Sequence, residues 1–546
     1  MNLKRIVLTT ISLLFLGFAA HSQDSTVYKI IPPQRTGGDE FGTSLVLQND
    51  ILAVGASNYD GGINNAGGVF IFSRKAPGQW AFQQNLQPSG SSVGDGFGIS
   101  MDMDNGQMII GTLGDNLDAD GNFPMEDAGS AYIYELGASE WTETAKLTPS
   151  DRMEDDRFGL EVAMQEDRVL IGARRQDLDP NGSSPIPNAG AVYSFEKTSD
   201  GGWLQLQKLV SPNRQDSSFF GWSIDIKGDL AIVGAPGESV SYNNQEVTQA
   251  GKAYIFRQDL AQNWVLESEI KAGDPETLDY FGREVLITST HAFVAAPFKD
   301  VQDSLGNTLA DAGAVYVYEY QGNGFWQQTQ KLIGYASSYQ ESFGENMSLH
   351  QEYLLVSGHR KRKVNPVGDT LYRMGTAYVF EKNASNGFDI LAELRTPDHR
   401  EFDQFGYDVT IDRGTAIISA INQDFGLGAN SDSIESAGAV YVFNESTFDY
   451  FRVDGAGGNQ GGETGIRNQT SALTISVFPN PANGQVTIKS PDALLEEIRV
   501  FDLTGRLIYE DKLRSYEAFI NLEQKGVLLL EAKTENGMGR YRILSQ

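Results

Sequence analysis

Short apolar runs separated by polar turns make up most of the chain. In a representative stretch, residues 221–226 alternate between apolar and polar positions, residues 227–229 read Lys-Gly-Asp, and the apolar run at 230–233 ends in Gly-Ala-Pro. Alternation with a period of two predicts half-buried strands, a polar pair with Gly predicts a tight turn, and Pro ends strand pairing. No segment sustains a period of about 3.6 residues, so the sequence predicts an all-β fold and excludes a helical solenoid.

The strand pattern repeats seven times. Each repeat begins with a Phe-Gly pair, and a small residue stands fourteen positions after the Phe. The Phe residues are Phe41, Phe97, Phe158, Phe220, Phe281, Phe343 and Phe405. The small residues are Gly55, Gly111, Gly172, Gly234, Ala295, Ser357 and Ser419. Each unit reads as four short strands, and seven such units predict a seven-bladed β-propeller over residues 23–452.

The start of the chain predicts how the ring closes. Residues 28–32 read Tyr-Lys-Ile-Ile-Pro and precede the first Phe-Gly pair much as residues 208–212 precede the fourth. We therefore expect residues 28–32 to supply the outer strand of the last blade. Such closure removes open strand edges, which would otherwise invite aggregation.

The repeated spacing resembles that of a known family. The interval from Phe-Gly to Gly-Ala-Pro, as at residues 220–236, is similar to the FG-GAP repeat of integrin α-chain propellers and of many secreted bacterial proteins; the resemblance covers about residues 26–450. It implies the propeller fold without fixing the function, because one fold hosts many kinds of site. The chain departs from the integrin pattern, since the interval that holds a calcium loop in integrins is a tight hairpin here.

The N-terminal segment reads as a secretory signal. Lys4 and Arg5 precede an apolar run at residues 6–20, and the small residues that follow predict removal of residues 1–22. The apolar run is short for a membrane span and no later run is long enough, so no integral membrane segment is expected in the mature chain. The chain contains no cysteine, which excludes disulfides and thiol chemistry.

The C-terminal part predicts a second domain. Residues 453–472 are rich in Gly, Asn, Gln and Thr and read as a flexible linker. Short strands over residues 473–546 favour a small β-sandwich. Phe-Pro-Asn-Pro at 478–481 and Asp-Leu-Thr-Gly-Arg at 502–506 resemble the C-terminal sorting domain of cargo of the Por (type IX) secretion system of Bacteroidota.

The sorting-domain resemblance implies a route and a partner. It implies export through the periplasm to the outer cell surface or the medium, with the type IX outer-membrane secretion machinery as the partner that reads the tail. A carbohydrate-binding sandwich is the alternative interpretation of the same strands.

Composition narrows the classes of function. The chain has 72 acidic and 42 basic residues and a net charge of −30, so repulsion by phosphates argues against nucleic acid as a partner. Its five histidines lack the spacing of a zinc site or a catalytic triad. No catalytic residue is nominated, because acidic residues are too numerous for the sequence to single out a carboxylate pair.

One acidic position recurs two residues before the Phe of the repeats. Its members are Asp39, Asp95, Asp156, Asp279, Glu341 and Asp403, with Ser218 in the remaining unit. The structural interpretation is that these side chains accept backbone N–H groups in the turn entering the inner strand. A functional ring of acidic groups is the alternative.

Two variable loops hold the candidate metal ligands. Oxygen-bearing side chains stand there at alternate positions and are followed by Gly, as in the first half of a calcium loop. The candidate ligands are Asn116, Asp118, Asp120, Asp177, Asp179 and Asn181. No Glu stands at the twelfth position, so calcium and a metal-free turn rich in Asp and Asn both stay open.

One basic cluster stands out in the acidic chain. Arg360, Lys361, Arg362 and Lys363 read either as a solvated loop or as a contact for an acidic polysaccharide or lipopolysaccharide. The loops after the seven small residues are expected on one face of the ring, and loops on a rigid scaffold commonly carry recognition. The sequence therefore favours a secreted or cell-surface binding or adhesion protein whose loop face meets an extracellular polymer or protein. A polysaccharide-active enzyme with a central site and a structural coat protein are the alternatives.

Overall fold

The computed structural model describes residues 27–453 and 476–545, apart from short gaps. The gaps are residues 35, 77, 117–123, 304, 336, 365–369, 397, 399, 425–433, 449–450, 452, 479–484, 490–493, 503–505, 516, 523–525 and 535–536. The chain divides into two compact units, Met1–Gly458 and Asn459–Gln546, and each is described by itself. Among the described residues, no helix has the length and apolar character needed to cross a membrane.

The described residues of the first unit form seven four-stranded antiparallel sheets. The first three sheets contain β2 (Leu45–Gln48), β3 (Ile51–Ala56), β4 (Gly68–Ala76) and β5 (Gln79–Leu86); β6 (Phe97–Asp104), β7 (Gln107–Thr112), β8 (Ser130–Leu136) and β9 (Trp141–Leu147); and β10 (Phe158–Gln165), β11 (Arg168–Ala173), β12 (Ala191–Lys197) and β13 (Trp203–Leu209). The next three contain β14 (Ile224–Lys227), β15 (Leu230–Ala235), β18 (Lys252–Gln258) and β19 (Trp264–Ile270); β20 (Val285–Ile287), β21 (His291–Ala296), β24 (Ala314–Tyr320) and β25 (Trp326–Leu332); and β26 (Met347–His350), β27 (Tyr353–Ser357), β30 (Ala377–Lys382) and β31 (Phe388–Leu394).

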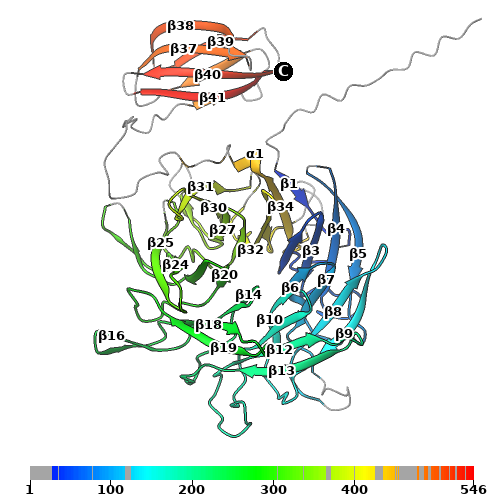
Figure 1. Cartoon of the computed structure of the whole chain (residues 1–546). Helices are drawn as coiled ribbons and strands as arrows, with labels where there is room; N and C mark the ends of the chain where they lie inside the picture. The colour runs from blue at the N-terminus through cyan, green and yellow to red at the C-terminus, as the bar shows by residue number, and fades with distance from the viewer. Residues whose placement is uncertain are drawn as a thin grey trace, which may run out of the picture. The chain divides into compact units, whose positions relative to one another are not determined.

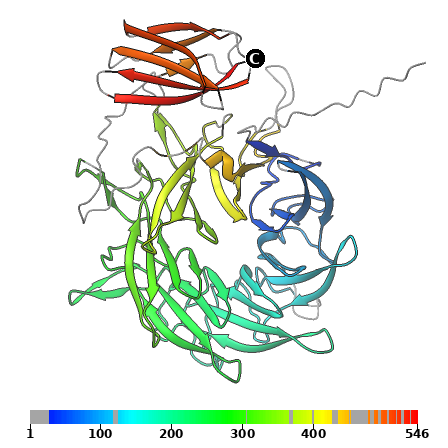
Figure 2. The same ribbon diagram turned by 45° about the horizontal axis from the view of Figure 1, so that its top comes forward.

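The N-terminal strand completes the seventh sheet. This sheet contains β32 (Phe405–Asp412), β33 (Thr415–Ala420), β34 (Ala439–Asn444) and β1 (Tyr28–Ile30). Strand β1 pairs antiparallel with β34, with Lys29 opposite Tyr441, which confirms the expectation that the start of the chain supplies the outer strand of the last unit. The sheets surround a central opening (Figures 1 and 2), an arrangement that fits a β-propeller.

Short elements decorate the connections. Three loops between the second and third strands of a sheet contain two-stranded hairpins, and one helical turn follows β34. These elements are β16 (Val240–Tyr242) with β17 (Gln245–Val247), β22 (Val301–Gln302) with β23 (Thr308–Leu309), β28 (Lys363–Val364) with β29 (Thr370–Leu371), and α1 (Glu445–Phe448).

Close packing fixes the Phe-Gly pair at, or a few residues before, the start of each inner strand. Phe158 is fully buried and meets the rings of Tyr193 and Phe195 edge to face, with centroids 5.7 and 6.1 Å away. Gly159 has a φ of +90°, and a Cβ there would lie 2.2 Å from the carbonyl oxygen of Ser130. A side chain is therefore excluded by both the backbone conformation and the space, which explains why the pair recurs.

The recurring acidic position closes the turn that enters the inner strand. Each carboxylate accepts a hydrogen bond from the backbone N–H three residues earlier, as Asp156 does from Met153 at 2.8 Å. Ser218 bridges the same turn with reversed polarity, because its hydroxyl donates to the backbone oxygens of Gln215 and Ala189. The structural interpretation of this position is confirmed.

The second unit contains two antiparallel sheets. A three-stranded sheet contains β35 (Ser476–Phe478), β36 (Gln485–Lys489) and β39 (Glu517–Asn521). A four-stranded sheet contains β37 (Leu495–Asp502), β38 (Leu507–Ser515), β40 (Gly526–Thr534) and β41 (Gly537–Ser545). Val486 and Ile488 from the first sheet share a buried core with Val500 and Leu530 from the second.

Candidate functional site

Two of the candidate calcium residues close their loops through backbone contacts. Asn116 Oδ1 accepts the N–H of Asp127 at 2.8 Å, and Asp177 Oδ1 accepts the N–H of Asn188 at 2.7 Å. Asp127 and Asn188 both have a φ of 50°, so each side-chain oxygen stabilises a left-handed backbone position. The same contact is made in other units by Asp60, Asp300 and Asp424.

The other candidate calcium residues fall into two groups. Asp179 Oδ1 accepts the backbone N–H groups of Asn181 and Ser183 at 2.9 and 3.0 Å, and these hydrogen bonds, above all that from Ser183, lower the pKa of Asp179. Asp118 and Asp120 lie outside the described residues. Within the described ranges, no group of three or more His, Cys, Asp or Glu residues is arranged to hold a metal ion. Calcium binding by these loops stays a prediction.

The basic cluster splits into residues with different surroundings. Lys361 is buried, and its Nζ lies 3.0 Å from Glu393 Oε1 and donates to the carbonyl of Tyr335 at 2.9 Å. Lys299, at the same place in the preceding unit, is likewise buried and lies 3.3 Å from Asp279. Lys361 therefore holds its loop in place and is not exposed as a solvated loop residue would be.

Arg362 belongs to an exposed group of aromatic side chains. Its guanidinium lies 5.0 Å from the ring centroid of Tyr339 and 4.9 Å from that of Tyr372. The backbone N–H of Phe402 donates to the carbonyl of Tyr372 at 3.0 Å. The three aromatic side chains are 42% to 52% exposed. We call Tyr339, Arg362, Tyr372 and Phe402 the aromatic patch.

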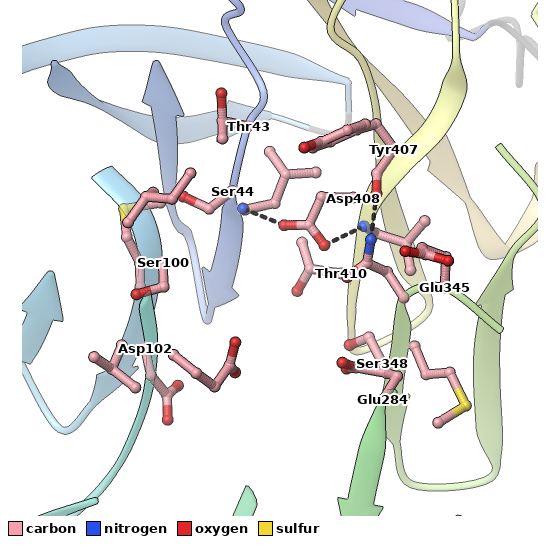
Figure 3. A pocket seen from close by; sticks show the side chains of 18 of the residues that line it. Thr43, Ser44, Ser100, Asp102, Glu284, Glu345, Ser348, Tyr407, Asp408 and Thr410 are labelled. Atoms are coloured by element: carbon pink, nitrogen blue, oxygen red, sulfur yellow. Dashed lines mark hydrogen bonds between the residues drawn. The ribbon is translucent and has the colours of Figure 1, made fainter. Parts of the chain in front are cut away.

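Arg360 lies elsewhere, on a cavity at the centre of the first unit. The cavity has a volume of about 500 Å³, and residues of the inner strands from all seven sheets line it. Figure 3 shows Ser100 and Asp102 on one side of the cavity and Ser348 and Glu284 on the other. Arg360 Nε donates to His359 Nε2 at 3.2 Å beside this cavity, whereas Lys363 begins strand β28.

Arginine side chains gather at one end of the cavity. The ring of Trp222 lies between the guanidinium groups of Arg174 and Arg283, at 3.8 and 4.0 Å from the ring centroid. Arg283 Nη2 pairs with Glu345 Oε1 at 2.7 Å. Burial and the charge of Arg283 lower the pKa of Arg174 to about 9. We call Arg174, Trp222, Arg283 and Arg360 the arginine mouth.

Strand register explains why these residues meet. Trp222 and Arg283 are the first residues after the Phe-Gly pairs of the fourth and fifth sheets. Arg174 directly follows Ala173, which pairs with Phe158 at the start of the inner strand β10. All three side chains therefore lie on the face of the ring at which the inner strands begin.

Carboxyl groups line the cavity further along the inner strands. Asp225 Oδ2 accepts the N–H of Ile287, and Asp408 Oδ2 accepts the N–H of Leu45, both at 2.6 Å (Figure 3 shows the second). Burial raises the pKa of Asp102 and Asp408 to about 7 and that of Asp225 to about 6. These carboxyl groups satisfy N–H groups on the free edge of the next sheet, which would otherwise be unpaired.

Glu161 and Glu284 complete the inner lining. Glu284 Oε2 accepts a hydrogen bond from Ser223 Oγ at 3.1 Å. Burial raises the pKa of both glutamates well above the usual value; the negative charge of Asp408 raises that of Glu161 further, and Glu161 does the same to Glu284. Burial and the neighbouring negative charges therefore both favour the protonated form of these two glutamates.

Sequence reasoning missed Arg174, Trp222 and Arg283. The signal that could have found Trp222 and Arg283 is the residue immediately after each Phe-Gly pair, whereas Arg174 stands two residues after the small residue Gly172. The residues after the seven pairs are Thr43, Ile99, Leu160, Trp222, Arg283, Glu345 and Tyr407. The type of side chain at this position changes from unit to unit, whereas the preceding Phe-Gly pair is the same in all seven units. Such variation is expected of positions that line a cavity.

The repeated sheets and the C-terminal domain define a class of exported all-β repeat proteins. The FG-GAP repeat matches residues 25–72, 80–134, 141–195, 203–256, 264–318 and 391–443, more than half of the chain. The chain therefore belongs to the FG-GAP repeat family. The secretion system C-terminal sorting domain matches residues 476–544. A search of the curated proteins gave no match.

The sorting domain gives the destination of the protein. It indicates secretion or an outer cell-surface location, with the type IX secretion machinery as a partner. The repeat matches leave residues 319–390 uncovered. Arg360, Arg362, Tyr339 and Tyr372 all lie in that interval.

Proposed function

We propose that this secreted or cell-surface protein is a binding or adhesion protein. In this proposal the seven sheets are the blades of one seven-bladed propeller, and its loop face attaches to an extracellular polymer or protein. The C-terminal unit is then a small β-sandwich that serves export. The seven four-stranded sheets and the β1–β34 pairing support the propeller, and the core shared by the two C-terminal sheets supports the sandwich.

The aromatic patch carries the binding proposal. Tyr339 and Tyr372 expose 46% and 42% of their surface beside the guanidinium of Arg362, and Phe402, whose backbone bonds to that of Tyr372, is 52% exposed. Aromatic and arginine side chains are enriched at the centres of binding interfaces, because they bring large contact areas together with hydrogen bonding. The patch includes residues from the interval 319–390, which the FG-GAP repeat matches leave uncovered.

An array of extracellular glycans and matrix proteins, probed with the full-length protein, tests the proposal. We expect at least one polymer or protein to bind, and we expect the joint change Tyr339→Ala and Tyr372→Ala to weaken that binding by at least about tenfold. Arg362→Gln should weaken it most at low ionic strength, since exposed charges act over about 10 Å at 0.1 M salt.

Phe325→Ala is the matched control for the patch. Phe325 is 59% exposed, but it lies in the β24–β25 turn, at the other end of its sheet from the β21–β24 loop. It should leave binding unchanged. Equal losses in the patch and control variants, or an array without any ligand, would contradict the proposal.

A polysaccharide-active enzyme is the second candidate. The observation that favours it is that Glu161 and Glu284 line one cavity and that burial raises the pKa of both, since a carboxyl group that keeps its proton can serve as a general acid. Incubating the bound polymers with the protein and following chain shortening separates the two candidates. Turnover that Glu161→Gln abolishes while binding survives would favour the enzyme.

A further inference from the structure

The arginine mouth concentrates positive charge in a strongly acidic protein. The chain has a net charge of −30, yet the guanidinium groups of Arg174, Arg283 and Arg360 line one end of a single cavity. Glu345 pairs with Arg283 at 2.7 Å. In the part of the chain that the structure describes, neither Arg174 nor Arg360 has a carboxylate within ion-pair distance. Glu161 lies close enough to Arg174, and Glu345 to Arg360, for electrostatic interaction, but neither carboxylate makes direct contact with these two guanidinium groups. Both guanidinium groups therefore keep N–H groups without a carboxylate partner among the described residues.

Trp222 fixes two of the three guanidinium groups. Arg174 and Arg283 cover its two faces at 3.8 and 4.0 Å, so the indole cannot also serve as a stacking platform for a sugar ring. A guanidinium that stacks on a ring keeps the N–H groups at its edge available for donation. Arg283 already donates Nε–H and Nη2–H to Glu345 Oε1 at 3.1 and 2.7 Å, so Arg174 is the member of this pair that can receive a ligand. Planar, oriented N–H pairs match the two oxygens of a carboxylate.

The inner part of the cavity offers hydrogen-bond acceptors. Glu161 and Glu284 line it beyond the arginine mouth, and among the described residues only one carboxyl oxygen of Glu284, Oε2, accepts a hydrogen bond, from Ser223. Carboxyl oxygens at this place would repel a second anion but accept hydrogen bonds from hydroxyl groups. A ligand with one carboxylate and several neighbouring hydroxyls fits both ends of the cavity, whereas an acidic protein side chain fits only the mouth.

We propose that the arginine mouth binds the carboxylate of a uronic acid residue in an acidic polysaccharide, whose hydroxyls meet Glu161 and Glu284. The inference rests on the proposed binding function and names the ligand class. The cavity volume of about 500 Å³ is in the range of small-ligand sites, about 300 to 1,000 Å³. The same chemistry is present in a free uronic acid, so the test includes both sources.

The test measures binding of the full-length protein to polygalacturonate, free galacturonate and neutral dextran by titration calorimetry. Arg174→Gln removes a guanidinium that has no carboxylate in direct contact among the described residues, although its charge also acts on Glu161. We expect it to weaken binding of polygalacturonate by at least about tenfold, the size of one charge-assisted hydrogen bond. Arg360→Gln, in another loop, should have a similar effect. Dextran should not bind detectably at the cavity.

Arg175→Gln is the matched control. Arg175 neighbours Arg174 in sequence and carries the same charge, but its Nη1 pairs with Asp155 at 2.7 Å and it does not line the cavity. This variant should keep the affinity within about twofold, since only long-range charge is lost. Thermal melts of each variant show whether the fold is intact.

The outcomes separate the pocket from the wider binding function. Equal weakening by Arg174→Gln and Arg175→Gln, or equal binding of dextran and polygalacturonate, would overturn the pocket. Binding of free galacturonate that Arg174→Gln abolishes would support it even if no polymer or protein on the array bound, and the proposed function alone would then fail. An array ligand that needs the aromatic patch, together with no binding of galacturonate or polygalacturonate, would leave the function standing and remove the pocket.

Discussion

Acidic side chains at three recurring positions accept backbone N–H groups. Asp156 closes the turn before an inner strand, Asp177 closes a loop, and Asp225 caps the edge of the next sheet. Each contact ties a short side chain to a backbone group that would otherwise be unpaired, and such contacts favour Asp, Asn and Ser. Part of the acidic composition therefore has a structural origin, which explains why counting carboxylates in the sequence does not locate a site.

At the residue scale, we expect Asp177→Ala to destabilise the first unit by about 1 kcal/mol, the usual contribution of one hydrogen bond. Urea unfolding in the presence of a chelator measures the change. Asp177→Asn keeps the accepting oxygen, as Asn116 does in the preceding unit, and should lose little stability. If added calcium stabilises the wild type but neither variant, the residue is a metal ligand as well.

At the scale of elements, the first strand holds the ring closed. Strand β1 covers the edge of β34, and the side chain of Ile30 is buried in the core between the first and seventh sheets. The ion pair of Lys29 with Asp398, at 2.9 Å, lies at the surface. Burial and backbone pairing should therefore contribute more than the ion pair, because exposed ion pairs contribute about 0 to 1 kcal/mol.

Removal of residues 27–31 should lower the melting temperature by several degrees and promote aggregation, since it exposes the edge of β34. Differential scanning calorimetry and light scattering measure both effects. Lys29→Ala, which removes the surface ion pair and the cation–π contact with Tyr441 but keeps the strand pairing, is the control and should shift the melting temperature by less than about 3 °C. A truncated chain as stable and as monomeric as the intact one would show that β1 does not close the ring.

At the scale of the whole molecule, buried carboxyl groups link stability to pH. Burial raises the pKa of Asp102, Asp156 and Asp408 to about 7 and that of Asp95 and Asp279 to about 6. A raised folded-state pKa gives stability that is complete below the unfolded value of about 4 and is lost as the pH rises through the folded value. The net charge of −30 acts in the same direction, because repulsion grows as carboxyl groups ionise.

Groups with lowered pKa values limit the stability of the fold at acidic pH. The ion pairs of Glu345 with Arg283 and of Glu393 with Lys361 outweigh burial and lower the pKa of both glutamates, so their stabilisation is lost as the pH falls through the folded values. We expect the melting temperature to be highest near about pH 5 and to fall towards about pH 8. Asp102→Asn should flatten that fall between about pH 6 and 8; an unchanged slope would contradict the role of Asp102.

The sequence by itself determined the repeat, its strands and the closing strand. Phe158, Gly159 and Gly172 keep their spacing because the contacts they make within and between sheets are the same in every unit, so periodicity reveals them. The tertiary structure alone decided the site. Arg174, Trp222 and Arg283 come from three sheets and meet only because the ring places equivalent positions around one cavity.

The basic cluster shows the same division between adjacent residues. Arg360 lines the cavity, Lys361 is buried among acidic and aromatic partners, and Arg362 lies between two exposed tyrosine rings. In sequence the three are one run of positive charge. The loop that carries them passes from the central cavity, across the packed space between two sheets, to the surface. The neighbouring sheets therefore determine what each side chain contacts, and the sequence of the loop alone does not.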